Sequence, residues 1–301
     1  MADALCTSIK KLGLAMHPKL DRAQTAYIAI SDAAAKFGIE LTTIADLEGA
    51  TCQALVSIGG DGTLLSAIRR VYHLDIPVWG INVGHLGFLT TSGLDEIESG
   101  MKRLSEGNYS IEYRAMLEAE VIDEDGSFRK LVALNDIVVH REVPGGGILT
   151  LDTELDGHFL ATYVGDGLIV STPTGSTGYS LSAGGSILSP ALRAFILTTI
   201  CSHSLTGRSL VLDDSHTLVI RPRLETEEEF AFATADGQEV AKLVAFPSGS
   251  KTDPVQFSTV TIRRAKQDAG LIRFDDVFFS DVLRDKLGWA EETPLKKSPP
   301  R

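Results

Sequence analysis

A strand, a glycine-rich turn and a helix follow one another within residues 54–72. Ala54–Ile58 is an apolar run, Gly59-Gly60-Asp61-Gly62-Thr63 comes directly after it, and apolar residues recur at helical spacing over Thr63–Tyr72. Strands that alternate with helices of this length form βαβ units, in which the strands run parallel. This succession therefore predicts an α/β domain with a mainly parallel, Rossmann-like sheet.

The same alternation extends over residues 1–112, which we expect to form one domain. The pattern predicts further strands at Ser8–Ala15, Ile39–Ile44 and Ile76–Ile81, and helices at Arg22–Phe37 and Leu94–Leu104.

The pattern changes near Tyr113, where short β-rich runs replace the alternation. Hairpin turns such as Asp125-Gly126 and Asp156-Gly157 separate them, which predicts a mostly-β, sandwich-like domain over residues 113–270. The predicted strands are Met116–Ile122, Leu131–His140, Ile148–Leu155, His158–Val164, Leu168–Thr172, Ser209–Leu212, Thr217–Arg221, Glu229–Ala233 and Val255–Arg263.

Two helices are predicted outside the first domain. One spans Gly185–Leu197 within the β-rich part, and the other spans Phe278–Leu287. The apolar face of the second helix must be buried, so we expect the segment 271–292 to return to the first domain. Residues 293–301 are rich in Pro and Lys and read as a disordered tail.

Charge and apolar run length exclude two classes of partner. The 301 residues carry a formal net charge of −12, whereas a sequence-tolerant nucleic-acid binder needs a basic face. Apolar runs fall short of the roughly 20 residues that cross a bilayer. The three separated cysteines, Cys6, Cys52 and Cys201, have no disulfide or metal spacing, so we expect a cytoplasmic protein that binds neither nucleic acid nor membrane.

The Gly59–Thr63 turn has the chemistry of an anion site. Backbone N–H groups converge where a helix begins, and the helix dipole favours negative charge there. The turn lacks the lysine of a P-loop. Asp61 is then open to a structural interpretation, as a helix N-cap or turn residue. It is also open to two functional ones: it can bind Mg²⁺, or it can accept the proton of a hydroxyl attacking a phosphoryl group.

Three further clusters each allow a structural and a functional interpretation. Asn82–Leu89 is a second glycine-containing turn, at the sheet edge where ligands of α/β sheets bind, or simply a tight turn. Asn135 and Asp136 interrupt a β-rich run, as a bulge or as a pair that binds ribose. Gly165–Gly185 is dense in small hydroxyls and glycines. Its embedded strand, Pro173 and Tyr179 favour a binding role over a flexible linker.

Together these motifs resemble the NAD kinase family. GGDGTLL at 59–65, NVGHLGF at 82–88, LND at 134–136, GDGLIVSTPTGSTGYSLSAGG at 165–185 and DGQ at 236–238 occur in the order of that family. GGDG alone is shared with 6-phosphofructokinases and with diacylglycerol or sphingosine kinases, but the TPTGST segment is not. The resemblance implies transfer of the γ-phosphate of ATP, or of polyphosphate, to the adenosine ribose 2′-hydroxyl of NAD. It also implies Mg²⁺ or another divalent cation, and a homodimer or homotetramer.

The resemblance also assigns roles by position. Asp61 is the implied general base, and the implied phosphate-binding residues are Gly59, Gly60 and Thr63. The implied NAD-binding residues are Gly62, Phe88, Asn135, Asp136, Asp166, Thr174, Thr177, Gly178, Tyr179, Ser182, Asp236 and Gln238. Asp136 stands where the family usually has Glu, and Gly178 where it usually has Ala. No metal ligands are assigned.

Two rival functions remain compatible with the sequence. A lipid or sugar kinase could share GGDG, and phosphorylation of such an acceptor but not of NAD would favour it. A non-catalytic dinucleotide sensor would bind NAD or NADP without turnover.

Overall fold

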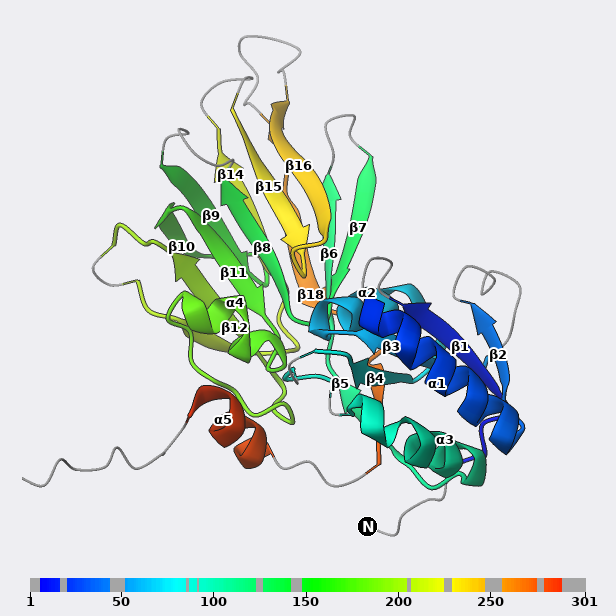
Figure 1. Ribbon diagram of the computed structural model, residues 1–301. Coiled ribbons are helices and arrows are strands. Elements are labelled where there is room, and N and C mark those ends of the chain that lie inside the picture. The colour runs from blue at the N-terminus through cyan, green and yellow to red at the C-terminus, as the bar shows by residue number, and fades with distance from the viewer. Residues whose placement is uncertain are drawn as a thin grey trace, which may run out of the picture.

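The computed structural model describes residues 6–16, 21–43, 52–84, 87–90, 92–122, 127–141, 148–204, 207–224, 229–246, 256–274 and 279–288. The predicted tail at 293–301 lies outside these ranges. Figure 1 shows helices around one sheet on one side of the molecule and two β-sheets on the other.

The first sheet has six strands in the order β2-β1-β3-β4-β19-β5. β2, β1, β3, β4 and β19 run parallel to one another, and β5 pairs with β19 in the antiparallel direction. The α/β prediction is thus confirmed in its coarse form, with a mixed sheet. The strands are β1 (Lys11–Met16), β2 (Glu40–Thr43), β3 (Ala54–Gly59), β4 (Val78–Asn82), β5 (Ser110–Arg114) and β19 (Ala269–Arg273).

Helices cover both faces of this sheet, which is why β3 and β4 are buried along their whole length. The side chains of α1 (Asp21–Phe37) and α3 (Ile97–Glu106, after a 3₁₀ turn at Leu94–Glu96) share one apolar core on one face. On the other face α2 (Asp61–Val71) packs Leu64, Leu65 and Ile68 against the sheet, and the 3₁₀ turn Tyr72–Leu74 follows it.

The rest of the chain is largely β, as predicted. A six-stranded sheet, β10-β9-β14-β18-β6-β7, and a seven-stranded sheet, β13-β12-β11-β8-β15-β16-β17, enclose one common apolar core. The strands are β6 (Leu117–Ile122), β7 (Phe128–Ala133), β8 (Asp136–Arg141), β9 (Leu149–Leu155), β10 (His158–Gly165), β11 (Gly167–Ser171), β12 (Ala194–Ile200), β13 (Leu210–Asp213), β14 (Leu218–Arg223), β15 (Phe230–Ala235), β16 (Glu239–Phe246), β17 (Gln256–Phe257) and β18 (Val260–Arg264).

Three predicted elements are wrong. The predicted single strand Val255–Arg263 is, over its described residues, two strands, β17 and β18, which lie in different sheets. The predicted helix Gly185–Leu197 is instead an irregular segment followed by strand β12, which pairs with β11 and β13. Apolar and β-branched residues fill this strand, and tertiary pairing decides their conformation. The predicted single strand Leu131–His140 is two strands, β7 and β8, in different sheets, separated by a bend at Leu134-Asn135.

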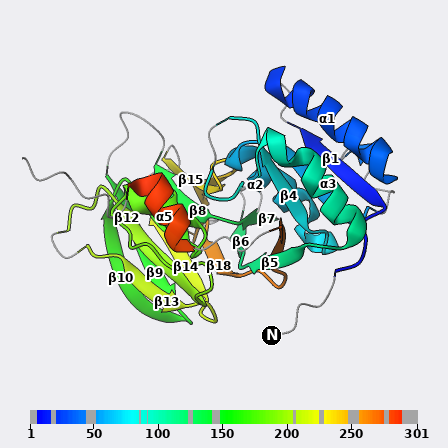
Figure 2. The same ribbon diagram turned by 60° about the horizontal axis from the view of Figure 1, so that its bottom comes forward.

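The C-terminal part of the chain contacts both halves of the molecule: the first half is the six-stranded sheet β2-β1-β3-β4-β19-β5 with its helices, and the β-rich half is the other two sheets. β19 completes the first sheet, and helix α5 (Phe279–Leu287) lies beside the β-rich half near β12 (Figures 1 and 2). Among the helices of the described residues, none is long and apolar enough to cross a membrane.

Candidate active site

The Gly59–Thr63 turn connects the end of β3 to the start of α2. Gly60 is the N-cap of α2, and its carbonyl accepts the Thr63 and Leu64 N–H groups at 3.0 and 3.1 Å. A Cβ at Gly59 would lie 2.2 Å from the Thr63 hydroxyl, so only glycine fits there. The first N–H groups of a helix have no partner inside it. The turn therefore presents free backbone donors beside Asp61.

The Asp61 side chain does not cap its own helix, so the N-cap interpretation is wrong. Asp61 is the first residue of α2, and no side-chain cap bond is present at this end. Its half-buried carboxylate instead receives donors from the next turn. Phe88 N–H lies 2.8 Å from Oδ2, and Thr90 donates its N–H and hydroxyl to Oδ1 at 3.1 and 3.0 Å. Leu89 N–H is 3.3 Å from Oδ1.

The Gly59–Thr63 turn and the Asn82–Leu89 turn therefore meet, as their position after neighbouring parallel strands predicts. Their contact is tight at Gly87, where a Cβ would lie 1.9 Å from Asp61 Oδ1. The glycine permits the backbone to approach the carboxylate, and residues 85–86 of this turn lie outside the described part.

A second aspartate, Asp236, organises the bend between β7 and β8. Its side chain is fully buried, and its backbone has φ +49°. Oδ1 accepts the Asn135 and Asp136 N–H groups at 2.8 and 3.3 Å, and Oδ2 accepts the Leu134 N–H at 3.1 Å. Arg69 of α2 donates to Oδ2 at 3.0 Å. The interruption at 134–136 is thus a bend shaped by a carboxylate.

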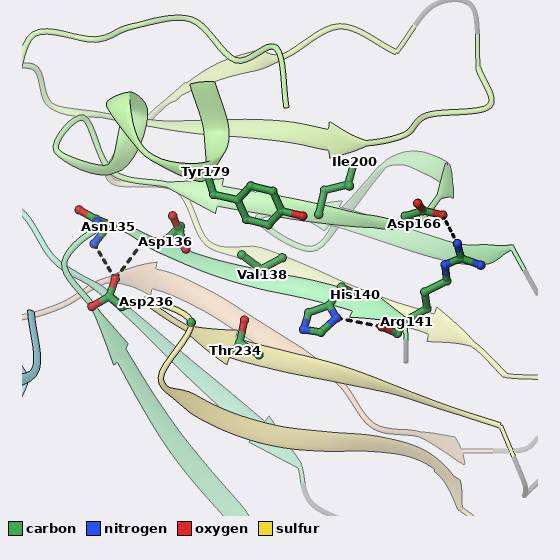
Figure 3. Close-up of a pocket in the computed structure, with 11 residues that line it drawn as sticks. Asn135, Asp136, Val138, His140, Arg141, Asp166, Tyr179, Ile200, Thr234 and Asp236 are labelled. Carbon is green, nitrogen blue, oxygen red and sulfur yellow. Dashed lines mark hydrogen bonds and ion pairs between the residues drawn. The ribbon is translucent and has the colours of Figure 1, made fainter. Parts of the chain in front are cut away.

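This bend forms one end of a cavity of about 740 Å³ in the β-rich half (Figure 3). The volume lies in the range of small-molecule and cofactor sites. Residues from separate strands and from α4 (Tyr179–Ser182) line it. They are Asn135, Asp136, Val138, His140, Arg141, Asp166, Tyr179, Ile200, Thr234, Asp236 and Gly237.

The two ends of the cavity differ in charge. At one end Asp136 is 6% exposed, and burial, with a smaller contribution from the Asp236 carboxylate, raises the pKa of Asp136 to about 7. At the other end Arg141 pairs with Asp166 at 3.0 Å (Figure 3). The Tyr179 ring lies across the cavity between these two ends (Figure 3).

A smaller cavity of about 160 Å³ lies between the two halves and α5. Its lining includes Phe88, Thr174 and Thr177, together with Phe279 and Val282 of α5.

Two buried arginines in this lining flank Glu112. Arg114 lies 2.7 Å and Arg273 2.9 Å from the Glu112 carboxylate. Burial raises the pKa of Glu112, but the two guanidinium groups outweigh burial and lower it overall. Arg114 also donates to the Thr174 hydroxyl at 3.3 Å, and Arg273 to the Leu89 carbonyl at 3.1 Å. This cluster joins the two halves behind the Asp61 turn.

Comparison with known proteins agrees with the order of these motifs. The ATP-NAD kinase N-terminal domain matches residues 10–109, and the ATP-NAD kinase C-terminal domain matches residues 134–273. The NAD kinase of Sulfurimonas denitrificans is 36% identical over 296 residues, which cover 94% of this chain and 98% of that relative. The NAD kinase of Gemmatimonas aurantiaca is 41% identical over 240 residues, 78% of this chain and 77% of the relative.

The chain belongs to the ATP-NAD kinase family.

Two solved kinases share its fold. A yeast NADH kinase, crystallised with NADH, superposes with a TM-score of 0.80 over 97% of this chain and 91% of the other, at 23% identity. An NAD kinase from Archaeoglobus fulgidus, crystallised with ATP, gives a TM-score of 0.68 over 92% and 97%, at 24% identity.

The structure distributes the predicted NAD kinase residues over three places. Asn135, Asp136, Asp166, Tyr179 and Asp236 line the large cavity, whereas Phe88, Thr174 and Thr177 line the small one. Gln238 contacts the Asp61 turn, since its amide donates to the Gly62 carbonyl at 2.9 Å.

Gly178 and Ser182 belong to neither cavity lining. The Gly178 N–H donates to Gly175 O at 2.8 Å within the TPTGST turn, and Ser182 is exposed on α4, outside both linings.

Sequence reasoning missed several residues at this site. Arg69 sits on a helix and Arg114 and Arg273 on strands, where a charged residue usually reads as solvated. Arg114 and Arg273 are 8% exposed, and no local pattern signals this burial. His140 and Thr234, by contrast, could have been found from strand alternation, because His140 lies four residues after Asp136 and Thr234 two residues before Asp236. Within the ranges that the structure describes, no three His, Cys, Asp or Glu side chains form a metal-binding group.

Proposed function

We propose that this protein transfers the γ-phosphate of ATP to the 2′-hydroxyl of the adenosine ribose of NAD. One observation carries the proposal: the anion-binding start of α2, with Asp61 fixed beside it, is linked through Gln238 and Asp236 to a cavity of nucleotide size. The relatives named NAD kinase, and neighbours crystallised with NADH and with ATP, support the same reaction.

The start of α2 suits the phosphates of ATP, because the first N–H groups of a helix have no partner inside it. Gly59, Gly60 and Thr63, which the resemblance assigns to phosphate, flank these donors, and the Thr63 N–H itself donates to the Gly60 carbonyl at 3.0 Å. In phosphoryl transfer, positioning and charge stabilisation supply most of the catalysis. The start of α2 provides both, because its donors belong to a backbone that the sheet already fixes.

Asp61 is the proposed general base. Two bonds from Thr90 occupy Oδ1, whereas Oδ2 has one short bond, from Phe88 at 2.8 Å, and a long contact of 3.4 Å from the Leu89 N–H. A carboxylate oxygen has about two lone-pair sites, and a contact as long as that of Leu89 is weak, so we assign the incoming 2′-hydroxyl to Oδ2. The bonds from the second turn fix the carboxylate, as a base within hydrogen-bonding reach of its proton requires.

The NAD molecule is proposed to occupy the large cavity and to extend toward Phe88. Asn135 and Asp136 would bind ribose or adenine at the end nearest Asp61, and Asp166 with Tyr179 would contact the other end of the dinucleotide. Thr174, Thr177, Gly178 and Ser182 would complete its contacts along the TPTGST segment.

A divalent cation, proposed as Mg²⁺, belongs with the phosphates of ATP, where Mg²⁺ in kinases is usually held by one or two carboxylates and the substrate. When bound, it neutralises the charge that develops on the transferred group.

A direct assay tests the function. The protein is incubated with NAD, Mg²⁺ and either ATP or polyphosphate, and NADP is followed with an NADP-specific dehydrogenase. Formation of NADP with ATP supports the proposal, and polyphosphate alone as donor would revise it. NAD binding without turnover would identify a sensor. Phosphorylation of diacylglycerol or fructose 6-phosphate, with none of NAD, would identify a different kinase.

Assembly into a homodimer or homotetramer and a cytoplasmic location rest on the family resemblance and the cysteine pattern. Light scattering of the purified chain and cell fractionation test them.

A further inference from the structure

Arg69 contacts the Asp236–Gln238 turn with two nitrogens. It lies on α2, the helix that begins at Asp61, yet its side chain is only 7% exposed. One terminal nitrogen donates to Asp236 Oδ2 at 3.0 Å, and the other to Gln238 Oε1 at 2.6 Å. Nε lies 3.8 Å from the Glu239 carboxylate. The guanidinium thus joins α2, the helix that follows β3 of the first sheet, to the turn between β15 and β16 in the β-rich part of the chain.

Each partner of Arg69 leads directly to one side of the site. Asp236 accepts the N–H groups of Asn135 and Asp136, which begin the large cavity (Figure 3). Gln238 donates to the carbonyl of Gly62, inside the turn that holds Asp61. The Arg69 side chain therefore orients the Asp236 carboxylate, which contacts the large cavity, and the Gln238 amide, which contacts the Gly59–Thr63 turn.

We propose that Arg69 is a positioning residue, which sets the Asn135–Asp136 bend relative to the Asp61 turn so that the acceptor hydroxyl meets the base. The proposal rests on the function proposed above, because it takes residues 135 and 136 as NAD contacts. A planar guanidinium can do this where lysine cannot, because it donates in two fixed directions at once.

A buried ion pair alone is weak evidence for stability, so the test must separate positioning from folding. The charges around Asp136 provide the means. The Asp236 carboxylate contributes to the raised pKa of Asp136, and Arg69 forms an ion pair with that carboxylate at 3.0 Å. The other titratable or charged groups in the cavity lining are His140, Arg141, Asp166 and Tyr179, and the variants leave them unchanged.

The experiment compares Arg69→Gln, Arg69→Lys and Asp236→Asn in the full chain, with Arg70→Gln as matched control. Arg70 is the exposed neighbour on the same helix, and its loss changes the net charge equally. The readouts are kcat and KM for NAD against pH, and Tm for every variant.

Arg69→Gln is expected to lower kcat/KM for NAD by about 10²-fold, the scale of a small misplacement of reacting groups. Asp136 is a proposed NAD contact, so its ionisation should appear in the acid limb of kcat/KM for NAD. In Arg69→Gln this limb should move to higher pH, because the Asp236 charge beside Asp136 is no longer paired with a cation. Asp236→Asn should move the limb to lower pH. Arg69→Lys keeps the charge, so its limb should stay in place while kcat/KM still falls severalfold. Arg70→Gln should match the wild type.

Wild-type kcat/KM in a folded Arg69→Gln protein would overturn the proposal, as would limbs that move in the same direction in Arg69→Gln and Asp236→Asn. If Arg69→Gln does not fold, Arg69→Lys decides: unchanged kcat/KM rejects the proposal, and a loss with an unmoved limb and a near-normal Tm supports it. Failure of the wild type to phosphorylate NAD would instead reject the proposed function.

Discussion

Asp61 and Asp236 gather the backbone of a neighbouring turn in the same way, yet only one of them is suited to chemistry. Both carboxylates accept N–H groups from residues distant in the sequence. The Asp236 side chain is fully buried and paired with Arg69, whereas the hydrogen bonds of the Asp61 carboxylate come from uncharged donors, Phe88, Leu89 and Thr90. A carboxylate whose charge is already matched by a cation shapes the fold, and one whose charge is not so matched keeps the capacity to accept a proton.

The largest expected effect comes from Asp61→Asn. The amide keeps the size of the side chain but cannot accept the proton, so NADP formation should fall by about 10²- to 10⁴-fold, the usual contribution of a general base. Coupled turnover assays and near-ultraviolet circular dichroism measure activity and fold. Turnover close to wild type would remove the base role and leave Asp61 as a loop anchor like Asp236.

Asp61 matters more than Asp236 for activity, but we expect the opposite for stability when each is replaced by alanine. Asp236→Ala leaves the buried Arg69 charge and three N–H groups without their acceptor, so unfolding should become easier by about 3–5 kcal/mol. Asp61→Ala leaves the Phe88, Leu89 and Thr90 N–H groups without this acceptor but strands no buried charge, so a smaller loss of about 1–3 kcal/mol is expected. Urea unfolding checks both values. Equal losses of unfolding free energy in Asp236→Ala and Asp61→Ala would mean that the Arg69 charge does not make the difference between the two sites.

Gly87→Ala tests how closely Asp61 must be placed. The added Cβ would meet Oδ1 at 1.9 Å and displace the carboxylate, so kcat should fall by about 10- to 10²-fold with little change in KM for ATP. Gly84→Ala is the matched control in the same turn, because its Cβ would have ordinary contacts, at 3.8 Å from the Asn82 side chain. Similar kcat values for the two variants would contradict a tight requirement.

The smallest effect concerns Asp136 and pH. Its folded-state pKa of about 7 lies above the ordinary 3.8, so the folded protein binds the extra proton between these values. This contribution to stability is complete at low pH and is lost as pH rises toward 7. Asp136→Asn should therefore raise Tm at pH 8 by about 5 °C, and by less at pH 5. Calorimetry at both pH values checks this, and an equal gain at both would show that ionisation is not the cause.

The sequence predicted the fold best where local pattern and tertiary environment agree. The Ala54–Tyr72 succession of strand, turn and helix is β3 and α2 with small shifts of boundary, because its strand is buried on both faces and its helix has one apolar face. The helix predicted at residues 185–197 was wrong because part of this segment, strand β12, pairs with β11 and β13, and this pairing decides its conformation.

The candidate site was predictable in its motifs but not in its connections. Asp236 was marked by the DGQ motif, yet nothing near it in sequence indicates that Asn135 is its partner or that Arg69 pairs with it. Such contacts join residues that lie far apart in the sequence, and side-chain chemistry alone does not choose among the available partners. The Gly59–Thr63 turn, by contrast, could be predicted from the sequence, because its conformation depends on neighbouring residues alone.

Strand β19 has a consequence for synthesis on the ribosome. It inserts between β4 and β5, so the first sheet lacks an interior strand until Ala269–Arg273 has been made. During most of translation the edge of β4 is therefore without its final partner, and an open strand edge invites pairing with other chains. The nascent chain cannot finish its first domain before its second, and a gene fragment that ends after β5 would encode a sheet with a gap in it.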